Sequence, residues 1–130
     1  MPELDLVLEP WVLSVCRLDA DAPWPPAPPR TPVHSVTRTP GELSVVCVAG
    51  HEPEGAQVEP GWRALRIVGP LALDMVGVVA SVTVPLAEAD VGVFVVSTYD
   101  TDLVLVKGAD LDVAFPALES AGHSLSTLPL

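Results

Sequence analysis

The chain has 130 residues, enough for one ordinary domain or two small fused subdomains, and its 49% hydrophobic content supports a packed core and excludes disorder over most of its length. Seventeen acidic residues against six basic ones give a formal net charge of −11, which repels phosphate backbones and anionic membrane surfaces. We therefore expect no nucleic-acid partner and no membrane partner. An acidic composition by itself is most simply a solubility feature.

Cysteine and histidine positions show no spacing typical of a metal site. Cys16 and Cys47 each lie inside an apolar run, which indicates reduced, buried thiols. The histidines, His34, His51 and His123, are scattered along the chain. We expect neither a metal nor a cofactor. The first residues show no basic region followed by a cleavage site, so we expect a cytoplasmic protein.

The N-terminal part predicts short strands and one irregular arm. Residues 4–8 and 11–18 are apolar or alternating, and Pro10 between them predicts a bend. Residues 22–32 contain six prolines, which cannot join an internal strand or a helix. We expect a surface arm packed on its own domain, with a polyproline ligand for a groove of the SH3 type as the alternative.

A tight turn follows the arm. Two strands are predicted on either side of it, at residues 33–38 and 43–48. Pro40 followed by Gly41 is strong turn chemistry, and Glu42 is expected to orient Arg38 or Arg17. This turn is either tied by a surface ion pair or used for a partner or ligand contact. Residues 51–60 are then interpreted as an acidic linker between two subdomains.

Residues 67–87 contain a single charged residue, Asp74, and resemble a membrane span in a hydropathy window. Gly69-Pro70 and Pro85 interrupt the run, so a strand, a turn and a helix explain it better. The segment at residues 75–89 is ambiguous. Alternating β-branched residues favour a strand, whereas Asp74 as an N-cap and an apolar stripe of helical spacing favour a helix.

The C-terminal part predicts a hairpin and a second helix. Residues 91–96 and 103–107 flank a polar hexad at residues 97–102, which is expected to protrude, and the first run is expected to be covered on both faces inside a sheet. Helical spacing follows from Leu111, with Gly122 as the residue after the C-cap and Pro116 either in the first turn or at a kink. A last strand is predicted at residues 123–128.

Two stretches carry a family resemblance. The run T-R-T-P-G-E-L-S-V-V-C at residues 37–47, and the segment from Pro85 through the hexad, resemble the ACT-domain proteins related to the CASTOR-type arginine sensors. The resemblance implies an α+β, ferredoxin-like βαββαβ fold, with two helices on one face of an antiparallel four-stranded sheet. It therefore favours a helix at residues 75–89. Residues 61–130 are expected to form a complete ACT domain, and residues 1–60 a degenerate, strand-rich ACT-like subdomain.

The resemblance also implies a ligand site, because ACT domains commonly hold an effector where the first strand meets the first helix. Independently of the family, helix N-terminal amides favour a carboxylate and glycine permits close backbone approach. The candidate ligand-binding residues come from this junction and from the hexad: Asp74, Met75, Val76, Gly77, Ser97, Thr98, Asp100 and Asp102. The alternatives are that Asp74 caps the helix and that Asp100 and Asp102 make local turns.

Catalysis has little support in the sequence, which contains no nucleophile elbow, no Cys-His context and no phosphate-binding loop. Asp100 and Asp102 could share a proton, but both are expected to be solvated on a hairpin tip. We predict a non-enzymatic regulatory module that binds a neutral or basic amino acid and forms a homodimer. The alternative is a dimerising protein-interaction module without a working ligand pocket.

Overall fold

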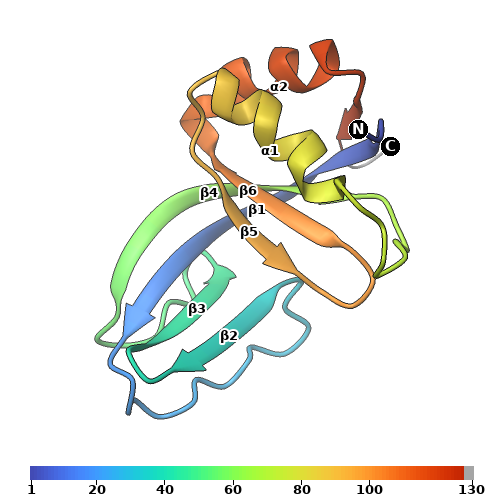
Figure 1. Cartoon of the computed structure of the whole chain (residues 1–130). Helices are drawn as coiled ribbons and strands as arrows, with labels where there is room; N and C mark the ends of the chain where they lie inside the picture. The colour runs from blue at the N-terminus through green and yellow to red at the C-terminus, as the bar shows by residue number, and fades with distance from the viewer. Residues whose placement is uncertain (128–130) are drawn as a thin grey trace. The chain divides into compact units, whose positions relative to one another are not determined.

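The computed structural model describes residues 1–127, and their contacts group the chain into two compact units (Figure 1). The first, which we call the helical unit, combines Met1–Pro10 with the chain from Arg63 onward. The second, which we call the strand unit, is Trp11–Trp62. Two long strands, β1 (Asp5–Leu18) and β4 (Gln57–Ile67), belong partly to each unit. The unit that contains both helices therefore also includes the first ten residues.

The helical unit is a sheet with two helices on one face (Figure 1). Its strand order is β7-β1-β4-β6-β5. The other three strands of this sheet are β5 (Phe94–Ser97), β6 (Asp102–Lys107) and β7 (Ser124–Thr127). The helices are α1 (Val78–Glu88) and α2 (Leu111–Ser120), and a 3-10 turn lies at Gly108–Asp110. From β4 to β7 the order is strand, helix, strand, strand, helix, strand. The predicted α+β, βαββαβ arrangement is thus confirmed.

The edge formed by β7 differs from the expected antiparallel sheet. β7 pairs in parallel with the start of β1, from Asp5 opposite Ser124 to Leu8 opposite Thr127, and β1 in turn neighbours β4. An additional strand therefore enters the expected four-stranded sheet, because the apolar N-terminal run is buried in the helical unit. Leu128, the last residue of the predicted final strand, lies outside the described residues.

The predicted hairpin is confirmed, but the placement of its first strand was wrong. β5 pairs with β6 in antiparallel register, from Phe94 opposite Leu105 to Ser97 opposite Asp102. β5 is the edge strand, and β6 is the internal one with its four central residues buried. Val91 is buried in the core of the unit without belonging to the strand, so the apolar run is longer than the strand itself.

α1 settles the ambiguous segment in favour of a helix. Val78, Val82 and Leu86 are buried at intervals of four residues, so one stripe of the helix packs into the core beside β-strand residues such as Ile67 and Val106. The helix begins at Val78 and not near Met75, and its N-cap is Gly77 with a φ of 81°. The predicted capping role of Asp74 is therefore wrong, since no side chain caps this helix.

Pro85 lies inside α1 and removes one helical hydrogen bond, because it has no N–H to donate to the carbonyl of Ser81. A histidine from the other end of the unit satisfies that carbonyl. His123 Nε2 donates to Ser81 O at 2.7 Å, and His123 Nδ1 accepts from the Leu4 amide at 3.1 Å. His123 is 5% exposed, so this imidazole is a buried link among α1, the N-terminal segment and the end of α2.

α2 starts at Leu111, so Pro116 lies in the helix interior. Of the two predicted alternatives for Pro116, the place in the first turn is excluded, and the kink stays a prediction. The predicted C-terminal glycine is confirmed. Gly122 has a φ of 98° and its amide donates to Glu119 O, while the His123 amide donates to Leu118 O. These are the two hydrogen bonds of a Schellman motif, which ends the helix and directs the chain into β7.

The strand unit contains β2, β3, the second part of β1 and the start of β4, in the sheet order β2-β3-β1-β4, and has a small core. β2 (His34–Thr39) and β3 (Glu42–Val48) form the predicted hairpin, and β3 pairs in antiparallel register with the second part of β1. Cys16, Val45 and Cys47 are fully buried together. Both thiols are free, as predicted, and burial raises the pKa of Cys16 and raises that of Cys47 to about 12. Both side chains are thus neutral thiols at physiological pH.

Two expectations about this region were wrong. β1 continues through Pro10 as a single strand, because Pro10 lies between the residues that pair with β7 and those that pair with β3, where a missing N–H is tolerated. The linker is also shorter than residues 51–60, since β4 begins at Gln57 and contains Pro60.

The proline arm adopts neither helix nor strand, as predicted. The contacts of Arg38 and Arg17 near the arm and the β2–β3 turn differ from the expected ion pairs. The Arg38 guanidinium donates to the carbonyls of Ala20 and Ala22, and its Cζ lies 5.8 Å from the centroid of the Trp24 ring. Arg17 donates to Gly41 O at 3.2 Å. Both arginines therefore donate hydrogen bonds to backbone carbonyls. The expectation that Glu42 orients Arg38 or Arg17 was wrong.

Candidate functional site

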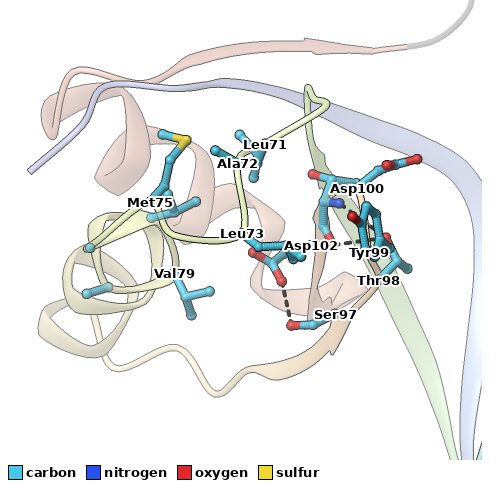
Figure 2. A pocket seen from close by; sticks show the side chains of 14 residues that line it. Leu71, Ala72, Leu73, Met75, Val79, Ser97, Thr98, Tyr99, Asp100 and Asp102 are labelled. Atoms are coloured by element: carbon cyan, nitrogen blue, oxygen red, sulfur yellow. Dashed lines mark hydrogen bonds between the residues drawn. The ribbon is translucent and has the colours of Figure 1, made fainter.

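A cavity of about 450 Å³ lies in the helical unit between the loop before α1, the first turn of α1 and the turn of the β5–β6 hairpin (Figure 2). We call it the hairpin cavity. Its lining residues are Leu71, Ala72, Leu73, Met75, Gly77, Val78, Val79, Ala80, Ser97, Thr98, Tyr99, Asp100, Thr101 and Asp102. The volume lies within the range of small-molecule sites.

The structure gathers most of the predicted ligand-binding residues around this cavity. The ones that line it are Met75, Gly77, Ser97, Thr98, Asp100 and Asp102. Asp74 and Val76 belong to the same loop but are not lining residues, and Val76 is 89% exposed. Neither Asp74 nor Val76 therefore has a structural reason to contact a molecule inside the cavity.

The hairpin wall is fixed by its own hydrogen bonds. Ser97 and Asp102 are the last pair of the β5–β6 ladder, and the Ser97 hydroxyl donates to Asp102 Oδ1 at 2.5 Å (Figure 2). The Thr98 amide and hydroxyl both donate to Thr101 O, at 2.8 Å and 3.0 Å. The turn therefore holds the Asp102 carboxylate in one orientation at the edge of the cavity.

The loop before α1 is tied to the same turn. The Leu71 amide donates to Asp100 O at 2.7 Å, and the Thr101 hydroxyl donates to Ile67 O at 2.5 Å. Gly69 makes this contact possible, because a Cβ there would lie 3.0 Å from Asp100 O. The predicted close backbone approach at this junction thus serves to join two walls of the cavity.

The first turn of α1 supplies backbone donors. Gly77 precedes the helix in the left-handed region, and Val78, Val79 and Ala80 are the first three helical residues. The N–H groups of a first helical turn have no acceptor within the helix, and no side chain caps this one. All three residues line the cavity. The helix terminus therefore offers amide donors and a partial positive charge to an anionic group.

The charged lining residues are both acidic. Asp100 and Asp102 are on the hairpin side, and no Lys, Arg or His is among the lining residues. The remaining wall is mainly aliphatic, from Leu71 to Met75 and from α1. A molecule with one carboxylate, one cationic group and an apolar portion would find a matching partner for each part.

Apolar side chains are also exposed near the mouth of this cavity. Leu73 is 70% exposed and Tyr99 is 79% exposed, and both line the cavity. Val76, in the same loop as Leu73, is 89% exposed but does not line the cavity. The loop and the hairpin tip thus each contribute one exposed apolar or aromatic side chain to the lining of the cavity.

Neither a metal site nor a membrane helix is found among residues 1–127. No group of three or more His, Cys, Asp or Glu side chains there is arranged to hold a metal ion. In the same range, no helix is long and apolar enough to cross a membrane.

Comparison with known proteins identifies the family. A family model described as an ACT domain matches residues 57–120, which cover β4, both helices and the hairpin. A protein of Agrobacterium tumefaciens, solved by X-ray crystallography, is 38% identical, with a TM-score of 0.89 over 98% of this chain and 95% of that one. The chain belongs to the ACT-domain family. The resemblance inferred from the sequence is thereby confirmed.

Two further proteins are similar to this chain, one in sequence and one in fold. The human cytosolic arginine sensor for mTORC1 subunit 1 is 46% identical over 67 residues, which are 51% of this chain and 20% of that protein. The chain therefore matches about a fifth of the length of this curated relative. The regulatory subunit of aspartate kinase from Thermus flavus has a TM-score of 0.63 at 11% identity, covering 92% of this chain and 99% of that one, which shows a shared fold.

Sequence reasoning missed several residues that shape the ACT-domain cavity. Thr101 joins the hairpin to β4, and Tyr99 and Leu73 form exposed walls. Thr101 and Tyr99 lie within the hexad that was singled out, so their position was a usable signal. Leu73 had no such signal, because its role depends on α1 starting at Val78 and leaving the preceding residues as a loop.

Proposed function

We propose that this ACT-domain chain is a non-enzymatic regulatory module that binds a free amino acid of neutral or basic type in the hairpin cavity. One observation supports this most directly: the first three residues of α1, whose amides no side chain caps, line the same cavity as Asp102. Figure 2 shows Val79 and Asp102 at this cavity. The similarity of about half of the chain to the human cytosolic arginine sensor for mTORC1 subunit 1 agrees with a role in sensing.

The carboxylate of the amino acid would bind at the start of α1. The amides of Val78, Val79 and Ala80 are the donors without helical acceptors, and Gly77 carries no side chain that would cover them. Anions at a helix N-terminus gain roughly 0.3–1 kcal/mol, and up to about 2 kcal/mol where partly buried.

The cationic group would bind at the hairpin. Asp102 Oδ1 already accepts from Ser97, which orients the carboxylate, and Asp100 adds a second negative charge near the turn. A second carboxylate on the ligand would meet these acids with no basic lining residue to balance it. Glutamate and aspartate should therefore bind much more weakly than arginine, lysine or neutral amino acids.

A calorimetric panel tests the proposal. Arginine, leucine and glutamate would be titrated separately into the purified chain at moderate salt, with a thermal-shift screen of all the standard amino acids in parallel. At about 100 times Kd, a bound amino acid should stabilise the fold by roughly 2.7 kcal/mol. Binding of glutamate in preference to arginine and leucine would refute the specificity, and no binding by any standard amino acid would refute the function.

The homodimer stays a prediction with two supporting features. β5 is at the edge of its sheet among the described strands, and the exposed Leu73 and Tyr99 lie beside the cavity. These features also favour the alternative of an interaction module without a ligand. Sedimentation velocity at tens of micromolar, with and without arginine, tests this: a monomer in both conditions would contradict the homodimer.

A further inference from the structure

A second cavity, of about 340 Å³, lies within the strand unit and is separate from the proposed amino-acid site. We call it the arm cavity. The proline arm, the end of β1, the start of β2 and the loop before β4 surround it. The side chains that matter for its chemistry are Trp24, Pro25, Pro26, His34, His51 and Glu54.

The arm wall is held in place in the free protein. Arg38 donates to the carbonyls of Ala20 and Ala22, and its guanidinium lies near the ring of Trp24. Proline has no N–H and a restricted φ, so Pro25 and Pro26 give a stiff, apolar wall without backbone donors. Trp24 is 59% exposed, and such an aromatic face beside proline rings suits stacking of a flat ring.

His34 is the unsatisfied polar group of this cavity. Both of its ring nitrogens are buried, and neither has a hydrogen-bond partner among the described residues. His123 shows the contrast, because each of its ring nitrogens is paired. A half-turn of the His34 ring about the Cβ–Cγ bond exchanges the nitrogens with Cδ2 and Cε1. Since the residue lines the cavity, this rotation can present the nitrogen edge to a bound molecule.

Charges at this cavity restrict its ligand. Glu54 and His51 are exposed lining residues, and the whole chain carries a formal net charge of −11. An anionic molecule is therefore disfavoured, whereas an amine gains a partner in Glu54. We propose that the arm cavity is a second binding site, for a small, neutral or cationic aromatic molecule whose ring carries a hydroxyl group that bonds His34.

Tyramine is the probe that matches every part of this site. Titration into protein labelled uniformly with ¹³C and ¹⁵N, followed by NMR, should shift the imidazole signals of His34 with a Kd below about 1 mM. Phenethylamine lacks the hydroxyl and should bind about tenfold more weakly. 3-(4-Hydroxyphenyl)propionate keeps the hydroxyl but replaces the amine with a carboxylate, and should bind more weakly than tyramine.

Variants separate the ligand contact from a structural role. His34→Phe removes the hydrogen bond to the hydroxyl but no protein hydrogen bond, so the Tm of the free protein should not fall while tyramine affinity drops about tenfold. Glu54→Gln should weaken tyramine binding about threefold, and Glu88→Gln, the same change on an exposed residue of α1, should leave it unaltered.

Three results would overturn the second site. The first is no shift of the His34 signals up to about 10 mM tyramine. The second is shifts confined to residues of the hairpin cavity, which would assign the probe to the other site. The third is equal affinity for tyramine and phenethylamine in the unaltered protein, which would remove the role of His34.

Discussion

In both units of the chain, side chains form hydrogen bonds with backbone carbonyls that have no partner in a helix or a sheet. The two units use different kinds of side chain for this. In the helical unit, a buried histidine compensates for a proline inside α1, and a two-layer core surrounds the contact. In the strand unit, the exposed Arg38 bonds the carbonyls of Ala20 and Ala22 at the start of the irregular arm, and the exposed Arg17 bonds Gly41 O in the β2–β3 turn. The core of this unit is small. Irregular backbone in the helical unit is thus stabilised by buried side chains, and in the strand unit largely from the surface.

The largest effect that tests this contrast is expected at His123. His123→Phe leaves Ser81 O and the Leu4 amide without their partners, which should lower the free energy of unfolding by about 2–3 kcal/mol. Pro85→Ala restores an N–H that can bond Ser81 O, so His123→Phe should cost about 1 kcal/mol less in that background. Urea denaturation of the four proteins measures the coupling, and additive effects would contradict the compensation.

A second, smaller effect is expected at Gly77. Its φ of 81° is unfavourable for any L-residue with a Cβ, although a Cβ there meets only Pro2 Cδ, at 3.8 Å. Gly77→Ala should therefore cost about 1–2 kcal/mol through the backbone, and Gly77→Asn clearly less. Thermal unfolding compares the two variants. Equal losses would show that the side chain at this position, and not its φ, limits the substitution.

The smallest effect is expected in the strand unit, at Ser14. The buried Ser14 hydroxyl donates to Glu52 Oε2 at 2.7 Å, and this bond holds the pKa of Glu52 below its ordinary value of 4.5. A lowered pKa stabilises the fold above pH 4.5, and this contribution is lost as the pH falls through the folded-state pKa. Ser14→Ala should cost about 1 kcal/mol at neutral pH. The difference in the free energy of unfolding between Ser14→Ala and the parent protein should become smaller at about pH 3. A gap independent of pH would contradict the assignment.

The sequence predicted the order of elements better than their boundaries. Gly122 was recognisable because a helix C-terminus needs a left-handed residue, and the hexad because turn residues separate two apolar runs. β1 was not predicted to be continuous, since Pro10 is a strand breaker unless its missing N–H falls between two ladders. Pairing over more than a hundred residues, such as Leu8 with Thr127, leaves no local pattern.

The candidate site was predictable in part for the same reason. Hexad residues were found from local turn chemistry, and six of the eight candidates line one cavity. Asp74 was chosen as a helix cap or ligand contact because α1 was expected to start near Met75, three residues before its actual start. The start depends on which apolar residues are buried, and alternating valines alone do not decide that.

The most direct measurement compares Asp102→Asn with Asp74→Asn by calorimetry, using arginine as the ligand. Both variants remove one negative charge, but only Asp102 lines the hairpin cavity. Loss of a charge-assisted hydrogen bond, about 1.5–3 kcal/mol, predicts at least tenfold weaker binding for Asp102→Asn. Asp74→Asn should bind like the parent, within about twofold. Equal weakening by both variants, or an unchanged Kd in Asp102→Asn, would contradict the assignment of the hairpin cavity as the amino-acid site.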